Sequence, residues 1–331
     1  MYDVAVIGCG VVGAAAAYEL SRYNCRVLVL EAKNDVANVT TKANSAILHA
    51  GYDPAPGSLM AKTNVRGVKL AKELCEKLDV ERDEIGSLVL AFNEEDERHL
   101  EMLYRQGLEN GVPGVELLTA DEVHALEPNV SEKVTAALYA PSAAIVSPWE
   151  FALALAETAV VNGCEVQLSA PVTGIDRIDG GYRLHTPKGD FEAHYIINAA
   201  GLHCDKVHEM VGGTGFTVHG VRGEYYIMDK SQGNVVSHVI FQCPNEKGKG
   251  VLVAPTVHGN LIVGPNAVNI SDPDGTENTA EGLAFVREMA LRSVPSISFR
   301  ENIRNFSGVR ANHPDDDFLI GENCRVPGFY E

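Results

Sequence analysis

Positive charge is scarce in this sequence. It has 27 lysines and arginines against 45 aspartates and glutamates, which gives a net charge of -18 at pH 7. Nucleic acids and anionic membrane surfaces select basic patches, so this balance argues against both as partners. No apolar run approaches the roughly 20 residues of a membrane span, and no basic leader precedes the apolar run at Val4. We therefore expect a cytoplasmic protein without a transmembrane segment.

Metal-binding and disulfide patterns are also missing. The seven cysteines are scattered singly without a CxxC pair, and the sequence contains no HxxxH or HExxH. These absences predict reduced, mostly packing thiols and no metal site. There is no internal repeat and no low-complexity linker, and 45% of the 331 residues are hydrophobic. That composition suits one large globular domain or two interleaved domains.

The first thirty residues predict a strand, a turn, a helix and a second strand. Residues 4–7 and 26–30 are apolar runs typical of buried strands, and 14–24 is compatible with a helix. Residues 8–13 match GxGxxG, and Glu31 closes the second run. This is the context that a dinucleotide-binding unit requires, which favours it over a glycine-rich turn that binds nothing.

The three glycines have separate expected roles. Gly8 permits the tight turn, Gly10 lets a pyrophosphate approach the backbone, and Gly13 lets helix and strand touch. The N-terminus of the helix offers free N–H groups and a positive dipole end to the phosphates. Glu31 would accept hydrogen bonds from a ribose, and its charge disfavours NADP. The predicted cofactor contacts in this unit are Gly8, Gly10, Val12, Gly13, Glu31 and Ala32.

This first unit does not separate FAD from NAD, but later segments do. A strand over Tyr195–Asn198 runs into residues 199–201, whose tiny side chains let the main chain pass against a bulky ligand. Residues 163–189, just upstream, predict a strand and a hairpin. No second GxGxxG appears, so we expect no separate nicotinamide domain, and FAD is favoured.

Several motifs in a fixed order resemble one family. GxGxxG and Glu31 are followed by TTKANSAILHAGYD, INAAG and FSGVRANHPDDDFLIGE, an order that resembles the D-amino-acid-oxidase-like superfamily of FAD enzymes. HAGYDPAPGSLMAKTNVRG, VRGEYYIMDK and KGKGVLVAPTVHGNLIVGPNA look like its branch of glycerol-3-phosphate dehydrogenases and L-2-hydroxyglutarate oxidases. The resemblance implies an α/β fold, in which a Rossmann-like FAD-binding domain carries a second α+β substrate domain on a largely antiparallel sheet.

The resemblance also implies further cofactor contacts. Residues 40–53 would lead the chain past the FAD phosphates toward the flavin ring, INAAG would face the FAD, and the strand near Val172 would lie by the adenine. The implied contacts are Thr41, Lys42, Ala43, Asn44, Ser45, Val172, Ala199, Ala200 and Gly201.

We expect two domains with the substrate site at their junction. The substrate domain would comprise residues 85–141 and 216–302, which are rich in strand-like alternation. In the family, a small-residue turn and a final helix follow the last motif, and some members carry a cysteine-rich iron–sulfur extension. Since the chain stops at Glu331, we expect a truncated protein with poor flavin affinity. The discontinuous FAD-binding domain would comprise 1–84, 142–215 and 303–331.

His49 and Arg310 are the leading catalytic candidates. An imidazole, with an ordinary pKa of about 6.5, can accept the hydroxyl proton of a substrate at neutral pH. The alternative for His49 is a hydrogen bond to the backbone beside the Gly51 turn. Matching family arginines reach the acid group of the substrate, and a guanidinium fork suits carboxylate and phosphate equally. The alternative for Arg310 is a salt bridge to one of Asp315 to Asp317.

Four further residues are weaker candidates. His258 lies in a predicted turn between two strands, where it would face either the flavin, as a catalytic group, or the solvent. Arg222 and Tyr226 share one strand face and are predicted to bind substrate. Lys249 is expected to be a loop lysine, with the alternative of gating an anionic substrate.

The sequence thus predicts an FAD-dependent oxidoreductase that moves a hydride from a small anionic 2-hydroxy substrate to flavin N5. Glycerol 3-phosphate comes first and L-2-hydroxyglutarate second. Amine or amino-acid oxidation, a non-catalytic flavin-binding subunit and an NAD dehydrogenase are the rival hypotheses. The electron acceptor stays open between oxygen, a quinone, a partner protein and a C-terminal domain beyond Glu331. An iron–sulfur or peripheral membrane partner is among these options.

Overall fold

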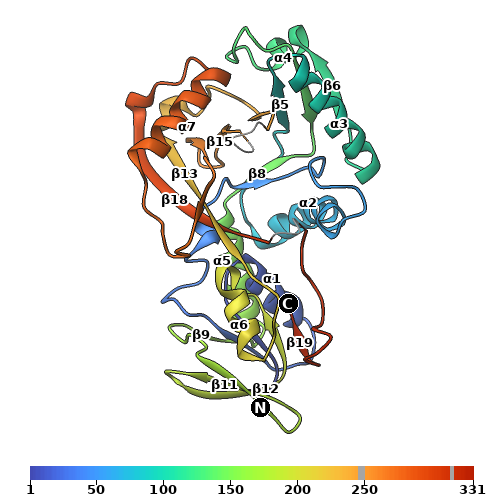
Figure 1. Cartoon of the computed structure of the whole chain (residues 1–331), viewed down its shortest axis with the longest axis vertical. Helices are drawn as coiled ribbons and strands as arrows, with labels where there is room; N and C mark the ends of the chain where they lie inside the picture. Colours follow the sequence, from blue (N-terminus) through green and yellow to red (C-terminus); the bar gives the residue numbers. More distant parts are fainter. Residues whose placement is uncertain (245–249, 314–316) are drawn as a thin grey trace.

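The computed structural model describes residues 1–244, 250–313 and 317–331, and Figure 1 shows their elements arranged along one long axis. The first sheet, near the N-terminus, has the order β10-β11-β12-β1-β2-β9, with β19 also pairing with β12. Its strands are β1 (Tyr2–Ile7), β2 (Val27–Leu30), β9 (Glu165–Gln167), β10 (Gly174–Ile178), β11 (Gly181–Thr186), β12 (Gly189–Asn198) and β19 (Phe329–Tyr330).

The centre of this sheet is parallel and buried on both faces. β1 pairs in parallel with both β12 and β2, and every residue of β2 is buried. A continuous apolar run such as VLVL is what a strand covered on both faces requires. α1 (Val11–Leu20) and α5 (Pro148–Val161) pack on one face, where α1 contributes the small side chains of Ala14 and Ala17 to the core. α6 (Cys204–Met210) packs on the other core cluster of the sheet through Val207.

The predicted strand, turn, helix and strand at the N-terminus are confirmed, with shifted ends. The helix begins at Val11, inside the glycine motif, and ends at Leu20 instead of continuing to Asn24. The reason for the early start is that Gly10 itself serves as the N-cap of α1. The strand predicted over Tyr195–Asn198 is the last part of the longer β12.

The second sheet has the order β17-β13-β16-β15-β14-β5-β7-β6, with β18 also pairing with β13. Its neighbours are antiparallel except for β14 and β5, so the predicted largely antiparallel sheet is confirmed. Its strands are β5 (Ser87–Ala91), β6 (Glu116–Thr119), β7 (Ala136–Ala140), β13 (His219–Met228), β14 (Val239–Gln242), β15 (Leu252–Pro255), β16 (Leu261–Gly264), β17 (Val268–Ile270) and β18 (Asn302–Asn312).

Helices and one small sheet complete the fold. α3 (Glu94–Asn110) and α7 (Ala280–Ser293) pack against the second sheet, and α2 (Leu59–Leu78) lies between the two main bodies in Figure 1. The small sheet has the order β3-β8-β4. The remaining elements are α4 (Ala120–Leu126), β3 (Ile47–Leu48), β4 (Arg82–Asp83), β8 (Ala144–Val146), η1 (Thr40–Lys42), η2 (Gly201–His203), η3 (Lys230–Gln232) and η4 (Phe299–Glu301).

Strand β18 differs from the predicted segmentation. The sequence predicts residues 303–331 to belong with the cofactor-binding pieces, but β18 pairs with β13 from His219↔Asn312 to Met228↔Asn302. Residues 302–312 therefore belong to the second sheet, because a strand joins the sheet whose backbone groups it satisfies. The strand ends close to the cofactor segment, as described below.

Candidate functional site

The glycine motif forms a tight turn at the carboxyl end of β1. Gly8 has φ +95, a left-handed conformation that favours glycine, and a Cβ atom there would lie 2.5 Å from the carbonyl oxygen of Ala199. A Cβ atom at Gly13 would lie 1.9 Å from the carbonyl oxygen of Gly8, so helix and turn touch. At Gly10 the nearest atom to such a Cβ is Thr41 Oγ1, at 3.1 Å. The backbone at Gly10 is therefore approachable by a ligand.

The N-terminus of α1 is prepared for an anion. Gly10 caps the helix without any side-chain hydrogen bond, and the first turn holds no acidic residue. The Thr41 hydroxyl accepts the N–H of Val11 at 3.0 Å, which leaves the proton of this hydroxyl for another acceptor. Exposed helix N–H groups and the helix dipole together attract phosphate oxygens.

Glu31 links the turn to the end of β2. Its carboxylate is only 7% exposed, and its two oxygens accept the N–H groups of Cys9 at 2.7 Å and Lys33 at 2.8 Å. Burial, together with the charge of Glu31, raises the pKa of the Cys9 thiol to about 12. Glu31, which the sequence predicts to bind a ribose, therefore lies at the turn and holds two backbone segments in place.

The other predicted cofactor residues lie in different surroundings. Ala199 continues β12 by donating its N–H to the carbonyl of Ile7, which brings residues 199–201 beside the glycine turn. Val172 packs on the core cluster of the first sheet. Ala32 and Lys42 are exposed, and Lys42 Nζ contacts Asn38 Oδ1.

Residues 40–46 are fixed by their own side chains and by β18. Asn44 donates to the carbonyls of Thr40 and Thr41 at 3.1 and 2.7 Å and accepts the N–H of Ala46 at 2.8 Å. This amide is therefore used to shape the turn. The Thr40 hydroxyl donates to the carbonyl of Val309 at 2.7 Å.

Gly308 is a site residue that the sequence argument missed. A Cβ atom at Gly308 would lie 1.8 Å from the carbonyl oxygen of Ala43, so β18 and the cofactor segment are in direct backbone contact. The signal was present as the glycine two residues before Arg310, within a strand pattern. A glycine inside a strand often marks such a close backbone approach.

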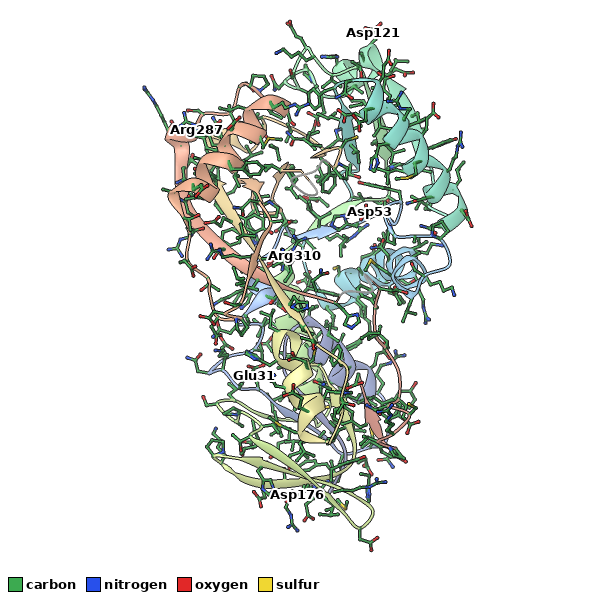
Figure 2. The ribbon with its side chains drawn as sticks, viewed as in Figure 1. Glu31, Asp53, Asp121, Asp176, Arg287 and Arg310 are labelled. Carbon is green, nitrogen blue, oxygen red and sulfur yellow. The ribbon has the colours of Figure 1, made fainter. Side chains whose placement is uncertain are left out.

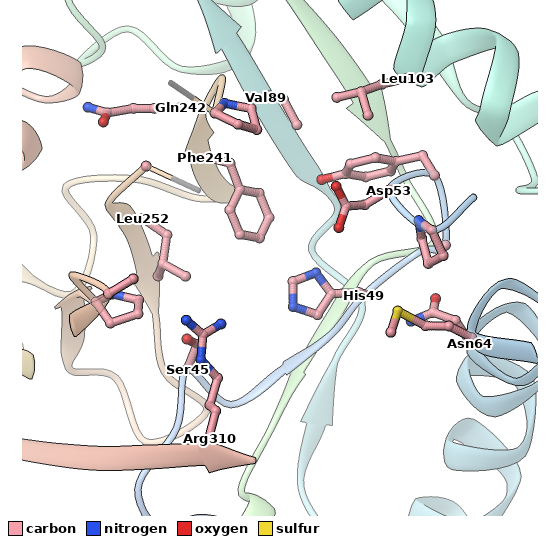
Figure 3. Close-up of a pocket in the computed structure, with 18 of the residues that line it drawn as sticks. Ser45, His49, Asp53, Asn64, Val89, Leu103, Phe241, Gln242, Leu252 and Arg310 are labelled. Atoms are coloured by element: carbon pink, nitrogen blue, oxygen red, sulfur yellow. The ribbon is translucent and has the colours of Figure 1, made fainter. Parts of the chain in front are cut away.

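A cavity of about 340 Å³ lies between the small sheet and the second sheet, and Figure 3 shows its lining. Ser45 and His49 line it from one segment, and Arg310 joins them from a distant part of the chain. The imidazole of His49 points into this space and stacks on Phe241, with ring centroids 5.5 Å apart and an angle of 28°. Arg310 extends from β18 to Ser45, and its guanidinium faces His49 in Figure 3. The two leading catalytic candidates are therefore brought together.

Asp53 is a further, acidic residue of the lining. The sequence did not single it out, although it lies in the same motif as His49, and its carboxylate faces the cavity in Figure 3.

The remaining lining is mostly apolar. The apolar side chains that line the cavity include Met60, Val89, Leu103, Leu252, Phe285 and Phe318. Such walls limit water around a bound substrate and strengthen the few polar contacts inside.

His258 lies away from this cavity. Its side chain is 51% exposed, and its ring nitrogens lie 3.6 Å from Glu81 Oε2 and 3.5 Å from Glu150 Oε1. The turn between β15 and β16 directs the imidazole toward this acidic pair instead of the cavity lining. Among the described residues, His258 thus lies beside Glu81 and Glu150 and outside the cavity lining.

Arg222 and Tyr226 do share one face of β13, as the alternation predicted, but that face is covered. Arg222 is 5% exposed and forms an ion pair with Glu277, and the Tyr226 hydroxyl donates to the carbonyl of Leu283 in α7 at 3.0 Å. Neither residue lines the cavity. Tyr225, directly before Tyr226, lies on the opposite face, with its hydroxyl 3.2 Å from Ser45 Oγ.

The alternatives that involve Lys249 and Asp315 to Asp317 fall only partly within the described residues. Lys249, Asp315 and Asp316 lie outside the described residues. Asp317 is described, and its carboxylate accepts the N–H groups of Leu59 and Met60 at the start of α2. These backbone contacts hold the pKa of Asp317 below its usual value.

The described residues contain neither a metal-binding cluster nor a membrane-spanning helix. Among residues 1–244, 250–313 and 317–331, no group of three or more His, Cys, Asp and Glu side chains is placed to hold a metal ion. Within the same ranges, no helix has the length and apolar character needed to cross a membrane.

The glycine turn, the segment at 40–46 that contacts it and the cavity together form the candidate site. The family model of FAD dependent oxidoreductases matches residues 3–330, and the chain belongs to this family. It is 48% identical to a glycerol 3-phosphate dehydrogenase of Caloramator mitchellensis, over 99% of this chain and 68% of that protein. It is 30% identical to an L-2-hydroxyglutarate dehydrogenase of Escherichia coli, over 94% of this chain and 71% of that protein.

A solved structure resembles the whole fold. The dithionite-reduced L-α-glycerophosphate oxidase of Mycoplasma pneumoniae with FAD bound superposes with a TM-score of 0.93 at 31% identity, covering 99% of this chain and 88% of that one. The family and this neighbour identify FAD as the cofactor, which confirms the prediction. The open backbone at Gly10 and the start of α1, whose first turn holds no acidic residue, fit its pyrophosphate.

Proposed function

We propose that this protein oxidises the secondary alcohol of a small anionic 2-hydroxy substrate, with glycerol 3-phosphate as the first choice. The observation that carries the proposal is the placement of His49 and Arg310 on one largely apolar cavity of about 340 Å³. The cavity offers a proton acceptor and a cation for the two ends of such a substrate. The 48% identity to a glycerol 3-phosphate dehydrogenase supports this choice.

The protein residues divide the remaining work. When bound, FAD supplies the hydride acceptor for the reaction. Arg310 holds the anionic end of the substrate, since a guanidinium fork matches the oxygens of phosphate and carboxylate. His49 accepts the hydroxyl proton at an imidazole nitrogen, and its ring is held in orientation by Phe241. The glycine turn, Thr41 and residues 199–201 would hold the cofactor.

We further propose that segments 1–84 and 142–215 carry most of the cofactor contacts. Segments 85–141 and 216–302 would supply the substrate-facing wall together with residues of the first segment such as His49 and Met60. Residues 302–312 are shared, because β18 pairs with the second sheet and touches Ala43. This division agrees with a substrate site at the junction of two bodies.

L-2-hydroxyglutarate is the second candidate substrate. It also carries a secondary alcohol and an anionic group, and the chain is 30% identical to an L-2-hydroxyglutarate dehydrogenase over most of its length. The fork of Arg310 does not discriminate a carboxylate from a phosphate.

Anaerobic bleaching of the bound flavin tests the proposal. The purified holoenzyme is mixed with glycerol 3-phosphate, each enantiomer of 2-hydroxyglutarate, lactate and several amino acids, and flavin absorbance is followed. We expect glycerol 3-phosphate to bleach the flavin fastest. Bleaching by amino acids alone would overturn alcohol oxidation, and bleaching by L-2-hydroxyglutarate alone would select the second substrate.

A further inference from the structure

Tyr225 is a buried tyrosine directly behind the cavity wall. It is 3% exposed, and its ring stacks on Phe306 with centroids 4.6 Å apart and an angle of 5°. β13 and β18 place the two rings opposite each other in register, so the phenol is held by both strands. Its hydroxyl can therefore point in few directions.

The one polar contact that the described residues give to this hydroxyl is Ser45 Oγ, at 3.2 Å. Ser45 itself lines the cavity beside Arg310, as Figure 3 shows. The backbone on both sides of Ser45 is fixed by Asn44, which binds Thr41 and Ala46. The contact between Tyr225 and Ser45 thus links a buried phenol to the part of the cavity that Arg310 lines.

Two hydroxyls that share one hydrogen bond must divide the roles of donor and acceptor. Burial raises the pKa of Tyr225, although the contact with Ser45 and the charge of Arg310 oppose that shift, so the phenol keeps its proton at neutral pH. If the phenol donates, the hydrogen of Ser45 is left to point into the cavity. An oxyanion held by Arg310 would favour this arrangement, because it accepts that hydrogen.

We propose that Tyr225 is a positioning residue that donates to Ser45 Oγ and thereby turns the Ser45 hydrogen toward the oxyanion of the substrate at Arg310. The inference deepens the proposed function and rests on its placement of a small anion beside Arg310. The ligand chemistry is an oxyanion, either phosphate or carboxylate.

The test is anion binding to the FAD-loaded protein, measured by calorimetry with inorganic phosphate and, separately, succinate. Binding needs no turnover, so it is independent of which alcohol is oxidised. Tyr225→Phe removes one oxygen and keeps the stacked ring. We expect it to weaken binding of the preferred anion about threefold to tenfold, the range of one neutral hydrogen bond. Comparing the two anions shows whether the subsite prefers a phosphate or a carboxylate.

A double-mutant cycle with Ser45→Ala separates positioning from general loosening. If Tyr225 acts through Ser45, adding Tyr225→Phe to Ser45→Ala causes no further loss. The steady-state KM should rise by the same factor as the dissociation constant, while kcat stays within about twofold. Tyr139→Phe on β7, which does not line the cavity, is the matched control and should bind like the wild type.

Three results would overturn the inference: wild-type affinity in Tyr225→Phe, an undiminished effect of that change in the Ser45→Ala background, or a wild-type holoenzyme that binds neither anion. Ser45→Ala alone tests the same contact from the cavity side if Tyr225→Phe does not fold. Flavin bleaching by glycerol 3-phosphate is scored separately, so the proposed substrate can fail while this coupling stands.

Discussion

The nucleotide turn and the substrate cavity are built in different ways. Nearly all of the turn comes from the first 41 residues, and several of its hydrogen bonds stay within that segment, such as those of Glu31 with Cys9 and Lys33. The cavity instead collects side chains from the segments that flank β3, from α2, from the second sheet and from α7. A contiguous motif can specify its own geometry, whereas a wall assembled from distant strands depends on which face of each strand is covered.

The largest effect should come from His49→Gln, which removes the proposed proton acceptor from the cavity. We expect turnover to fall about 10²–10⁴-fold, the usual range for a general base, with FAD retained because the glycine turn is untouched. The measurements are anaerobic flavin reduction in a stopped-flow instrument and the ratio of flavin to protein absorbance. His194→Gln, on the exposed side of β12, is the control. Near-wild-type reduction with bound FAD would remove His49 as the base.

Arg310→Met should have the next largest effect and reports on the cavity alone. Loss of a charge-assisted hydrogen bond costs about 1.5–3 kcal/mol, which corresponds to a rise in KM of roughly 10–150-fold. Arg310→Lys keeps the charge but loses the fork, so an intermediate KM is expected. Arg304→Met, on the same strand but outside the cavity lining, is the matched control. A KM within twofold of wild type in Arg310→Met would contradict the assignment.

Gly308→Ala tests the contact that joins the two regions. The new methyl group would meet the carbonyl of Ala43, and overpacking of this kind costs about 1–3 kcal/mol of unfolding free energy. FAD affinity should fall as well, because Ala43 lies in the cofactor segment. Gly67→Ala in α2, where nothing lies within 4 Å of the added carbon, should instead stabilise the protein by about 0.5–1 kcal/mol. Denaturant unfolding and flavin titration measure both effects, and a Gly308→Ala protein with unchanged FAD affinity would refute the coupling.

Tyr226→Phe should have the smallest effect and sharpens the assignment of faces on β13. Its hydroxyl donates to α7, so we expect the loss of about 0.5–1.5 kcal/mol of unfolding free energy and little change in KM. Thermal unfolding and steady-state kinetics measure the two quantities. A clear rise in KM would restore Tyr226 to the substrate-binding role predicted from the sequence.

These differences explain what the sequence could and could not predict. The first βαβ unit, the FAD cofactor and the antiparallel second sheet followed from local patterns and from motif order. Period-2 alternation placed Arg222 and Tyr226 on one face, but it could not show that α7 covers that face. The side of β13 that meets Ser45 became visible only through pairing with β18. The position of His258 could not be predicted either, because a turn has no periodic pattern that shows which way a side chain points.

The contact between Gly308 and Ala43 limits how independently the two halves can be exchanged. An engineer who grafted a second sheet of different specificity onto this nucleotide-binding half would have to transplant the strand around Gly308 together with the loop that it touches. The hydrogen bond from Thr40 to Val309 adds a second point at which graft and host must agree. Chimeras that keep Thr40 and Ala43 together with Gly308 and Val309 from the same parent should therefore fold more often than chimeras that separate them.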